Sequence, residues 1–352
     1  MSEILQAKLI ERGSWEETVP KDGLGDLFKE NPHPKHYIGI EISGFLHLGS
    51  LLSTGYKIND FKEAGAKCTV FLADWHTFIN EKLGGNWENI SKVSKYYEKA
   101  FKEVCPGVNV VLGSKLIEEN KEYWSDFVKF TKHTSLKRVQ RTLDIMGRSE
   151  NEEKIDLAKL LYPPMQAIDI HTLDVDIAHA GMDQRKIHML VRDVFPKLGW
   201  KVPVSVHHKI IPNLNQPRQE KKITPHGEAI TVLTKMSKSD PKSGIFISDS
   251  DEIISTKIKK SFCEQGKVYD SPLIDIVESI ILPKLKSIKI ESGNEMLVFN
   301  NFSDFIDSLD ENRIHPADLK NAIADGLIEI ISPLREKLQL DAEIEQIIQR
   351  ST

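Results

Sequence analysis

Short apolar segments that alternate with helical patterns constrain the fold of this chain most strongly. The segment "HYIGIEIS" (36–43) has the β-branched, apolar character of a buried strand and breaks at Ser43-Gly44. Apolar residues then recur at helical spacing over 46–64, and Gly65 stands where a C-terminal cap belongs. The alternation continues with "CTVFLADW", a helix over 86–104, "NVVLG", "DVDIAHAG", a helix over 183–198 and "VPVSVHHKII". It predicts an α/β fold with a Rossmann-like, mostly parallel sheet covered by helices on both faces.

Patterning also predicts two domains. Residues 123–146 read as a long basic helix within an insertion at about 114–160, and 211–229 reads as a polar loop. After Gly244 the strand signal fades and several helical patterns follow. We therefore expect an N-terminal extension and catalytic domain over 1–245, and a mainly α-helical domain over 246–352.

Composition narrows the partners and the compartment. The chain has 352 residues, 40% of them hydrophobic and 28% charged, with a net charge of -5, which excludes wholesale coating of nucleic acid but not a local basic face. Its three cysteines are widely spaced and form no C-x-x-C motif. No segment approaches the ~20 apolar residues of a membrane span. We expect a cytoplasmic protein with no membrane partner.

No metal site is expected from the sequence either. His207 and His208 are neighbours on a predicted strand, so their side chains point to opposite faces and make a poor metal pair.

Two polar motifs follow predicted strands. "SGFLHLGS" places His47 and Gly49 at the start of a helix, where free N–H groups and the helix dipole favour an anion. "TKMSKSDPKSG" (234–244) carries Lys235 and Lys238, which are suited to neutralise a migrating pyrophosphate. Taken singly, the first motif is explained equally well as a helix cap and the second as a solvated loop.

Together, in this order and on this fold, the two motifs resemble those of class I aminoacyl-tRNA synthetases, and the resemblance runs from about Tyr37 to the C-terminus. In that family both motifs bind ATP and stabilise the transition state as an amino-acid carboxylate attacks the α-phosphate. The resemblance therefore implies ATP with Mg²⁺ as the substrate complex, no tightly bound metal or organic cofactor, and no protein nucleophile. Ser50 stands where the family usually has a second histidine.

The segment "YPPMQAIDIHTL" bears on the amino acid. It puts Tyr162, Gln166 and Asp169 on one face of a helix, and a buried carboxylate requires a donor, such as a phenolic hydroxyl. With "YIGIEISGFLHLG", "FLADWH" and "GMDQRKIHML", it resembles tyrosyl-tRNA synthetases of the archaeal and eukaryotic type. The chain is also too short to hold a sizeable editing domain, which is consistent with tyrosine.

This resemblance implies roles for individual residues. Tyr37 and Asp169 would contact the substrate hydroxyl, and Glu41 would line the same site. The group that would hold the ammonium comprises Tyr162, Gln166 and Gln184. The residues implied at ATP are Gly39, Gly49, Gly181, Asp183, Met236, Ser237 and Ser239, of which Gly39 would leave room for substrate or ATP and Gly181 with Asp183 would lie at the ribose. The residues implied at tRNA are Arg141, Arg185 and Lys186 near the acceptor end, and His315 and Asp318 at the anticodon. The family is dimeric, which implies a homodimer.

Alternatives remain at this level. Tyr162 and Gln166 could be ordinary interior polar residues, and "HPAD" could simply start a helix, with Pro316 in its first turn. Asp240-Pro241 resembles the loop of tryptophanyl-tRNA synthetases, which makes tryptophan the second candidate substrate. A synthetase-like RNA-binding protein without aminoacylation activity is the third hypothesis.

Overall fold

The computed structural model describes residues 1–146, 156–223, 229–233, 242–264, 268–293, 295–311 and 313–351. The chain forms two compact units. The first unit comprises Met1–Gly44, Lys57–Lys209 and Ala342–Ser351, and the second comprises Phe45–Tyr56 and Ile210–Asp341. These units are defined by compactness alone, so the functional boundary near residue 246 stays a prediction.

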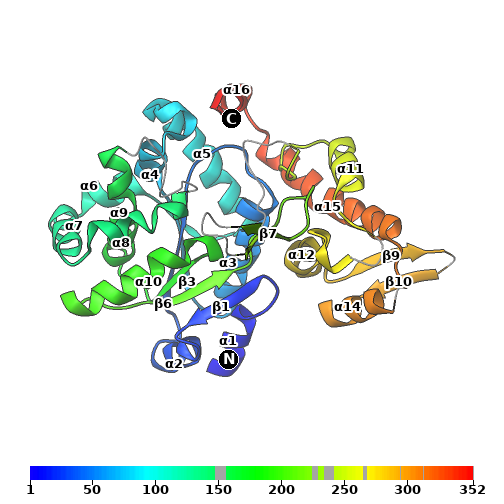
Figure 1. Cartoon of the computed structure of the whole chain (residues 1–352), viewed down its shortest axis with the longest axis horizontal. Helices are drawn as coiled ribbons and strands as arrows, with labels where there is room; N and C mark the ends of the chain where they lie inside the picture. Colours follow the sequence, from blue (N-terminus) through cyan, green and yellow to red (C-terminus); the bar gives the residue numbers. More distant parts are fainter. Residues whose placement is uncertain are drawn as a thin grey trace. The chain divides into compact units, whose positions relative to one another are not determined.

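A six-stranded sheet forms the centre of the first unit (Figure 1). Its strands are β1 (Trp15–Val19), β2 (Lys35–Ile40), β3 (Lys67–Leu72), β4 (Asn109–Leu112), β5 (Ile177–Gly181) and β6 (Val204–His208). Their order is β1-β6-β5-β2-β3-β4, and neighbouring strands are parallel except for the antiparallel pair of β1 and β6. The mostly parallel α/β sheet predicted from the sequence is confirmed.

The strand order also locates the expected binding site. The chain runs outward from β2 to β4 and then returns to the other side of β2 with β5 and β6. The direction of winding therefore reverses between β2 and β5, and open α/β sheets bind ligands at the carboxyl ends of the strands at such a point.

Helices surround this sheet. Those of the first unit are α1 (Glu3–Ile10), α2 (Gly23–Glu30), α4 (Asp74–Ile79), η2 (Lys82–Gly85), α5 (Trp87–Val104), α6 (Gly113–Glu119), α7 (Tyr123–Lys132), α8 (Leu136–Gln140), η3 (Leu143–Met146), α9 (Leu157–Thr172), η4 (Met182–Gln184), α10 (Arg185–Val194), η5 (Phe195–Leu198) and α16 (Ala342–Ser351). The predicted single helix over 123–146 is wrong, because α7, α8 and η3 divide it. The break has a local cause: the Ser135 hydroxyl accepts from the N–H of Arg138 and starts a new helix.

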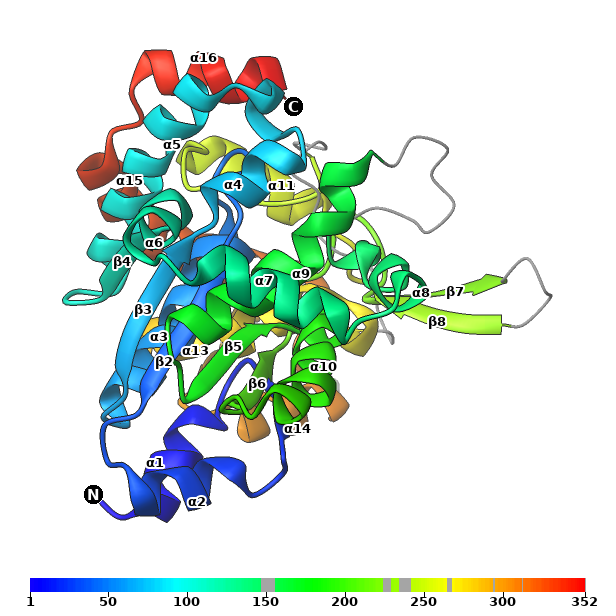
Figure 2. The same cartoon turned by 90° about the vertical axis from the view of Figure 1, so that its left-hand side faces the viewer.

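Side chains of β2 alternate between two faces of the sheet. His36 points to the face covered by α3 (Thr54–Glu63), where Phe61 packs at 4.3 Å between ring centroids, and we call this the α3 face. Tyr37 points to the other face, whose buried cluster also includes Tyr123 of α7 and Ile168 of α9; we call this the α9 face. Figure 2 shows α7, α9 and α10 lying in front of the strands on this side.

The second unit is built mainly from helices. They are η1 (Leu48–Ser53), which continues into α3, and α11 (Asp251–Lys260), η6 (Val268–Asp270), α12 (Leu273–Ile276), η7 (Val277–Ile281), α13 (Leu282–Leu285), α14 (Phe302–Asp310) and α15 (Pro316–Leu338). Two antiparallel hairpins join them: β7 (Gln219–Ile223) with β8 (Ala229–Leu233), and β9 (Ile288–Ser292) with β10 (Glu295–Phe299). The predicted loop over 211–229 is therefore wrong for the residues of β7. Over the part of the chain that the structure describes, no helix is long and apolar enough to span a bilayer.

Candidate active site

Polar side chains from β2, α4, α7, α9 and η4 gather in the first unit near the carboxyl ends of β2 and β5. The Tyr162 hydroxyl lies 3.5 Å from Glu41 Oε1, and Gln166 Nε2 lies 3.4 Å from Gln184 Oε1. Asp169 belongs to the same helix as Tyr162 and Gln166. We call these residues, together with Tyr37, Asp169, His76, Asn80 and Tyr123, the amino-acid cluster.

Asp169 is the deepest charge in this cluster, with 1% of its surface exposed. Its Oδ1 accepts a 2.8 Å hydrogen bond from the Tyr123 hydroxyl. Its Oδ2 has no hydrogen-bond partner among the described residues, and His76 Nε2 lies 3.6 Å away. Burial raises the pKa of Asp169 well above its ordinary value, the charge of Asp74 raises it further, and the bond from Tyr123 opposes the rise.

Tyr37 lies on β2 and is buried. A Cβ added to Gly39 would come within 2.5 Å of the Tyr37 hydroxyl oxygen, so the glycine provides the space in which that hydroxyl lies. Burial, and secondly the charge of Asp169, raise the pKa of Tyr37 well above its ordinary value, so Tyr37 stays a neutral donor. The structure thus gives Gly39 a reason that the sequence did not suggest, while the predicted contact with substrate or ATP stays a prediction.

The other end of the cluster is rich in acceptors. Asn80 donates a 2.7 Å hydrogen bond to Glu41 Oε1, which orients the carboxylate. Gln184 donates through Nε2 to the carbonyl of Ile145, which fixes its amide with Oε1 facing Gln166. Gln166 Oε1 is buried and has no hydrogen-bond partner among the described residues. A carboxylate and an amide oxygen suit an ammonium group, which has three donors and no acceptor.

Unpaired buried polar atoms single out this cluster as a place prepared for a ligand. Asp169 Oδ2, Gln166 Oε1 and His76 Nε2 all lack a hydrogen bond within the described ranges of the chain. Such atoms are costly in a protein interior unless a ligand or water pairs with them. The ring of His76 meets that of Tyr162 edge to face at 4.5 Å, and burial lowers the pKa of His76 to about 4, so its imidazole is neutral at pH 7.

Sequence reasoning missed Tyr123, His76 and Asn80. His76 and Asn80 follow β3 closely, at the sheet edge where ligands bind, and inspecting each strand end would have found them. Tyr123 is separated from Asp169 by 46 residues, and no local pattern links the two.

His47 begins the π-helix η1 in the second unit. Its Nδ1 accepts from the N–H groups of Gly49 and Ser50 at 3.2 and 3.4 Å, while Ser50 Oγ accepts from the N–H of His47 at 3.0 Å. This reciprocal capping box gives Ser50 a structural role at the position of the family's second histidine. Because Nδ1 accepts, the ring proton lies on Nε2, which is therefore a donor.

The backbone joins this motif to the residues that follow the second motif. Leu48 N–H bonds the carbonyl of Ile245 at 3.1 Å, and Ile247 N–H bonds that of Leu46 at 2.9 Å. The ring of Phe246 stands edge to face on that of His47 at 6.3 Å. The fold thus brings the end of the predicted 234–244 loop beside His47. The loop residues Lys235, Met236, Ser237, Lys238, Ser239 and Asp240-Pro241 lie outside the described residues.

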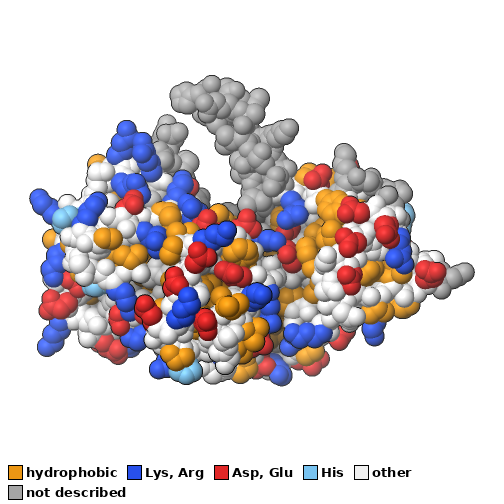
Figure 3. Space-filling model, turned by 90° about the horizontal axis from the view of Figure 1, so that it is seen from below, with side chains coloured by type: hydrophobic (Ala, Val, Ile, Leu, Met, Phe, Trp, Pro, Cys, Tyr) orange, Lys and Arg blue, Asp and Glu red, His pale blue; other side chains and the backbone are white. Residues whose placement is uncertain are grey.

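The remaining predicted ATP and tRNA residues are dispersed. Gly181 ends β5 and Asp183 follows in η4, at the winding reversal of the sheet. Lys186 Nζ lies 3.3 Å from the carbonyl of Arg141, and Arg185 Nε bonds Glu17 at 2.6 Å. On the face that Figure 3 shows, basic and acidic side chains are intermingled rather than separated.

His315 caps α15. Its Nδ1 accepts from the N–H of Ala317 at 3.1 Å, Pro316 is the first helical residue, and Asp318 lies in the first turn. A helix start alone therefore accounts for "HPAD", and the anticodon contacts stay a prediction.

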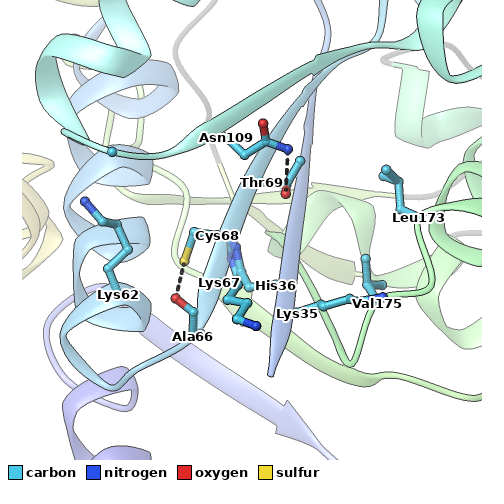
Figure 4. Close-up of a pocket in the computed structure, with 11 residues that line it drawn as sticks. Lys35, His36, Lys62, Ala66, Lys67, Cys68, Thr69, Asn109, Leu173 and Val175 are labelled. Atoms are coloured by element: carbon cyan, nitrogen blue, oxygen red, sulfur yellow. Dashed lines mark hydrogen bonds between the residues drawn. The ribbon is translucent and has the colours of Figure 1, made fainter. Parts of the chain in front are cut away.

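A cavity of about 410 Å³ lies elsewhere in the first unit (Figure 4). Lys35, Lys67 and Asn109, the first residues of β2, β3 and β4, line it, so it lies at the amino ends of the strands, opposite to the amino-acid cluster. Lys35 pairs with Asp174 and Asn109 with Thr69. The site must therefore be sought in the cluster and not in this cavity.

Buried histidines occupy both faces of the sheet. On the α3 face His36 bonds His179 at 3.0 Å and His179 bonds His208 at 2.8 Å. On the α9 face His207 bonds His188 at 3.0 Å. The prediction that His207 and His208 point to opposite faces is confirmed. Within the described ranges no group of three or more His, Cys, Asp or Glu side chains is arranged to hold a metal ion.

The comparisons with known proteins agree with this geometry. The family model for class I tRNA synthetases (W and Y) matches residues 29–332. Tyrosine--tRNA ligases of Thermococcus sibiricus and Pyrococcus abyssi are 41% and 40% identical, over 96% and 95% of this chain and 95% of each relative.

A solved structure is similar over nearly its whole length. The crystal structure of tyrosyl-tRNA synthetase from Pyrococcus horikoshii, complexed with L-tyrosine, has a TM-score of 0.87 and 36% identity, and the alignment covers 99% of this chain and 100% of that one. Sequence, fold and the polar cluster at the sheet edge lead to one assignment: the chain belongs to the class I tRNA synthetases, and within them to the tyrosyl-tRNA synthetases of the archaeal and eukaryotic type.

Proposed function

We propose that this chain is an ATP-dependent tyrosine–tRNA ligase that activates L-tyrosine and transfers it to tRNA(Tyr). The observation that carries the proposal is the polarity of the amino-acid cluster. Asp169 Oδ2 offers an unpaired acceptor at one end, and Gln166 Oε1 with Glu41 offers acceptors at the other. A phenolic hydroxyl and an ammonium group fit these two ends.

The cluster assigns roles to its residues. The Tyr37 hydroxyl and Asp169 Oδ2 bind the substrate phenol, and Tyr162, Gln166 and Gln184 hold its ammonium group with Glu41 beside them. Phenylalanine would leave both Asp169 and Tyr37 without a partner in a buried place. A site built to hydrogen-bond a substrate hydroxyl rejects the analogue without it by about 10⁵-fold in tyrosyl enzymes, a known magnitude and not one calculated for this chain.

Activation needs no nucleophile from the protein. A carboxylate oxygen of tyrosine attacks the α-phosphorus of ATP, the bond to pyrophosphate breaks, and tyrosyl-adenylate forms. His47 donates from Nε2 to a phosphate oxygen, and Lys235 and Lys238 neutralise charge on the departing pyrophosphate. Gly49, Met236, Ser237 and Ser239 contribute backbone and hydroxyl groups to ATP, and Gly39, Gly181 and Asp183 adjoin its nucleoside. Mg²⁺ arrives with ATP and shields the triphosphate.

Transfer follows when a ribose hydroxyl at the tRNA terminus attacks the adenylate carbonyl and releases AMP. Arg141 and Lys186, adjacent in the structure, and Arg185 contact the acceptor end of the tRNA. His315 and Asp318 read the anticodon by stacking and hydrogen bonding. The protein works as a homodimer in the cytoplasm.

Tryptophan is disfavoured as the substrate. An indole N–H could also donate to Asp169, and Asp240-Pro241 resembles the loop of tryptophanyl enzymes. Against this, relatives at 41% and 40% identity over nearly the full chain are tyrosine ligases, and the loop is assigned to ATP rather than to the amino acid.

Amino-acid-dependent exchange of labelled pyrophosphate into ATP tests the proposal. Tyrosine should support exchange, and tryptophan and phenylalanine should support little. Exchange with tryptophan but not tyrosine would overturn the substrate. Exchange with no amino acid would favour the hypothesis of an RNA-binding protein without aminoacylation activity.

A further inference from the structure

The two oxygens of Asp169 have different surroundings. Oδ1 accepts a 2.8 Å hydrogen bond from Tyr123, whereas Oδ2 has no hydrogen-bond partner among the described residues. A carboxylate that is free to rotate about its last bond exchanges its two oxygens. A donor on one oxygen therefore decides which oxygen faces a ligand.

Tyr123 is placed to do this and little else. It is the first residue of α7, and only 1% of its surface is exposed. Its ring packs edge to face on Trp124 at 5.4 Å, while its hydroxyl reaches Asp169 and, more distantly at 3.4 Å, the carbonyl of Met165. Burial, then the charge of Asp169, raise the pKa of Tyr123 far above its ordinary range, so the hydroxyl keeps its proton.

Several ionisable groups from different elements act on Asp169. They are Tyr37 of β2, Asp74 and His76 of α4, Tyr123 of α7 and Tyr162 of α9. Burial and Asp74 raise the pKa of the carboxyl group, and the Tyr123 hydrogen bond lowers it. Tyr123 therefore favours the ionised carboxylate, which accepts hydrogen bonds only.

We infer that Tyr123 is a positioning residue for amino-acid selection: its hydroxyl holds Asp169 so that Oδ2 faces the phenol of the substrate, and so sets the discrimination between tyrosine and phenylalanine. The inference rests on the proposed tyrosine-activating function and adds a residue that does not itself touch the substrate. It places one determinant of specificity on α7, outside β2 and α9.

The test compares Tyr123→Phe with the wild type in pyrophosphate exchange, with tyrosine and with phenylalanine, from pH 6 to pH 9. Removing a hydrogen bond to a charged acceptor should raise the KM for tyrosine roughly tenfold, leave kcat within about twofold, and lower the tyrosine-to-phenylalanine ratio of kcat/KM roughly tenfold. Because the variant raises the pKa of Asp169, its KM should be worst at low pH and recover as the pH rises. A purely structural role would not shift the pH profile.

Two further variants complete the design. Tyr96→Phe is the matched control, since Tyr96 is also buried, lies on α5 and has no hydrogen bond from its hydroxyl printed by the geometry of the described chain; its KM and ratio should equal those of the wild type. Tyr123→His keeps a ring donor and should restore most of the discrimination. If Tyr123→Phe fails to fold, Tyr123→His decides alone: discrimination within about threefold of the wild type supports the inference.

Three outcomes count against the inference. They are a ratio and pH profile for Tyr123→Phe that match Tyr96→Phe, a loss confined to kcat, and a folded Tyr123→His variant that discriminates no better than Asp169→Ala. In each case the wild type still exchanges with tyrosine, so the proposed function survives. Failure of wild-type exchange with tyrosine would overturn both.

Discussion

The two faces of the central sheet both bury polar side chains, but they treat them differently. On the α3 face, His36, His179 and His208 bond one another in a row. On the α9 face, Asp169 Oδ2 and Gln166 Oε1 have no hydrogen-bond partner among the described residues. The first arrangement pairs its polar groups within the protein, whereas the second leaves acceptors for something that binds. The comparison separates polar residues that serve the fold from those that serve a ligand.

The largest expected effect concerns the α3 face and acid. Burial lowers the pKa of His36 and of His208 to about 3, and that of His179 well below its ordinary 6.5. Above pH 6.5 these rings are neutral in both folded and unfolded chains; below it, the unfolded chain binds protons first, so stability falls. The three histidines should together lower the free energy of unfolding by about 4 kcal/mol between pH 7.5 and 5.5, measured by urea unfolding.

A pair of variants isolates this contribution. His36→Gln removes one of the three rings and should reduce the acid loss by about 1.4 kcal/mol. His33→Gln alters an exposed histidine and should leave the pH dependence unchanged. Equal pH dependence in the two variants would show that the α3-face row does not govern acid stability.

On the α9 face, Asp169→Ala should have the next largest effect. It removes the acceptor for the substrate hydroxyl, so the KM for tyrosine should rise and discrimination against phenylalanine should fall by at least about 100-fold in pyrophosphate exchange. Asp275→Ala is the control, because it removes another buried carboxylate, paired with Arg218 in the second unit. The ratio of the two substrates is independent of the folded fraction. Unchanged discrimination in Asp169→Ala would remove Asp169 from the pocket.

Gln166→Leu should have a smaller effect, confined to the ammonium end. The KM for tyrosine should rise roughly tenfold, while binding of 4-hydroxyphenylpropionate, which lacks the ammonium group, should stay the same. Gln6→Leu is the control: Gln6 is also buried, but its amide bonds the carbonyl of Ala64. If both ligands weaken equally, Gln166 supports the pocket as a whole rather than the ammonium group.

The smallest expected effect is that of Gly39→Ala. The new methyl group would displace the Tyr37 hydroxyl, so the KM for tyrosine should rise about threefold with little change in melting temperature. Gly25→Ala, where an added Cβ meets nothing within 4 Å, should leave the KM unchanged and raise stability slightly. A wild-type KM in Gly39→Ala would mean that Tyr37 tolerates displacement.

The sequence predicted the buried parts of the fold better than the exposed parts. β2, β3, β5 and β6 follow from continuous apolar, β-branched runs, because strands buried on both faces must be apolar throughout. β1 ("WEETV") and β7 ("QEKKI") are largely polar, β1 lies at the sheet edge and β7 in a two-stranded hairpin, and neither carries that signal. Edge pairing is decided by neighbours distant in sequence, so a local pattern does not reveal it.

The same limit applies to the amino-acid cluster. Tyr162, Gln166 and Asp169 share a helix, so their spacing alone predicts a common face. Tyr123 and His76 reach Asp169 from α7 and α4, and only the packing of those helices brings them there. Ser50 was explained by local geometry, since its bond to the N–H of His47 completes a cap.

The residues of the amino-acid cluster all belong to one compact unit, while His47, Gly49 and the backbone pairing at Ile245 belong to the other. This partition matters for protein engineering. A library that randomises positions on α4, α7 and α9 to accept a different side chain leaves the cap of η1 and its hydrogen bonds to Ile245 intact. Selectivity can thus be redesigned as a separate variable, with the ATP chemistry inherited unchanged.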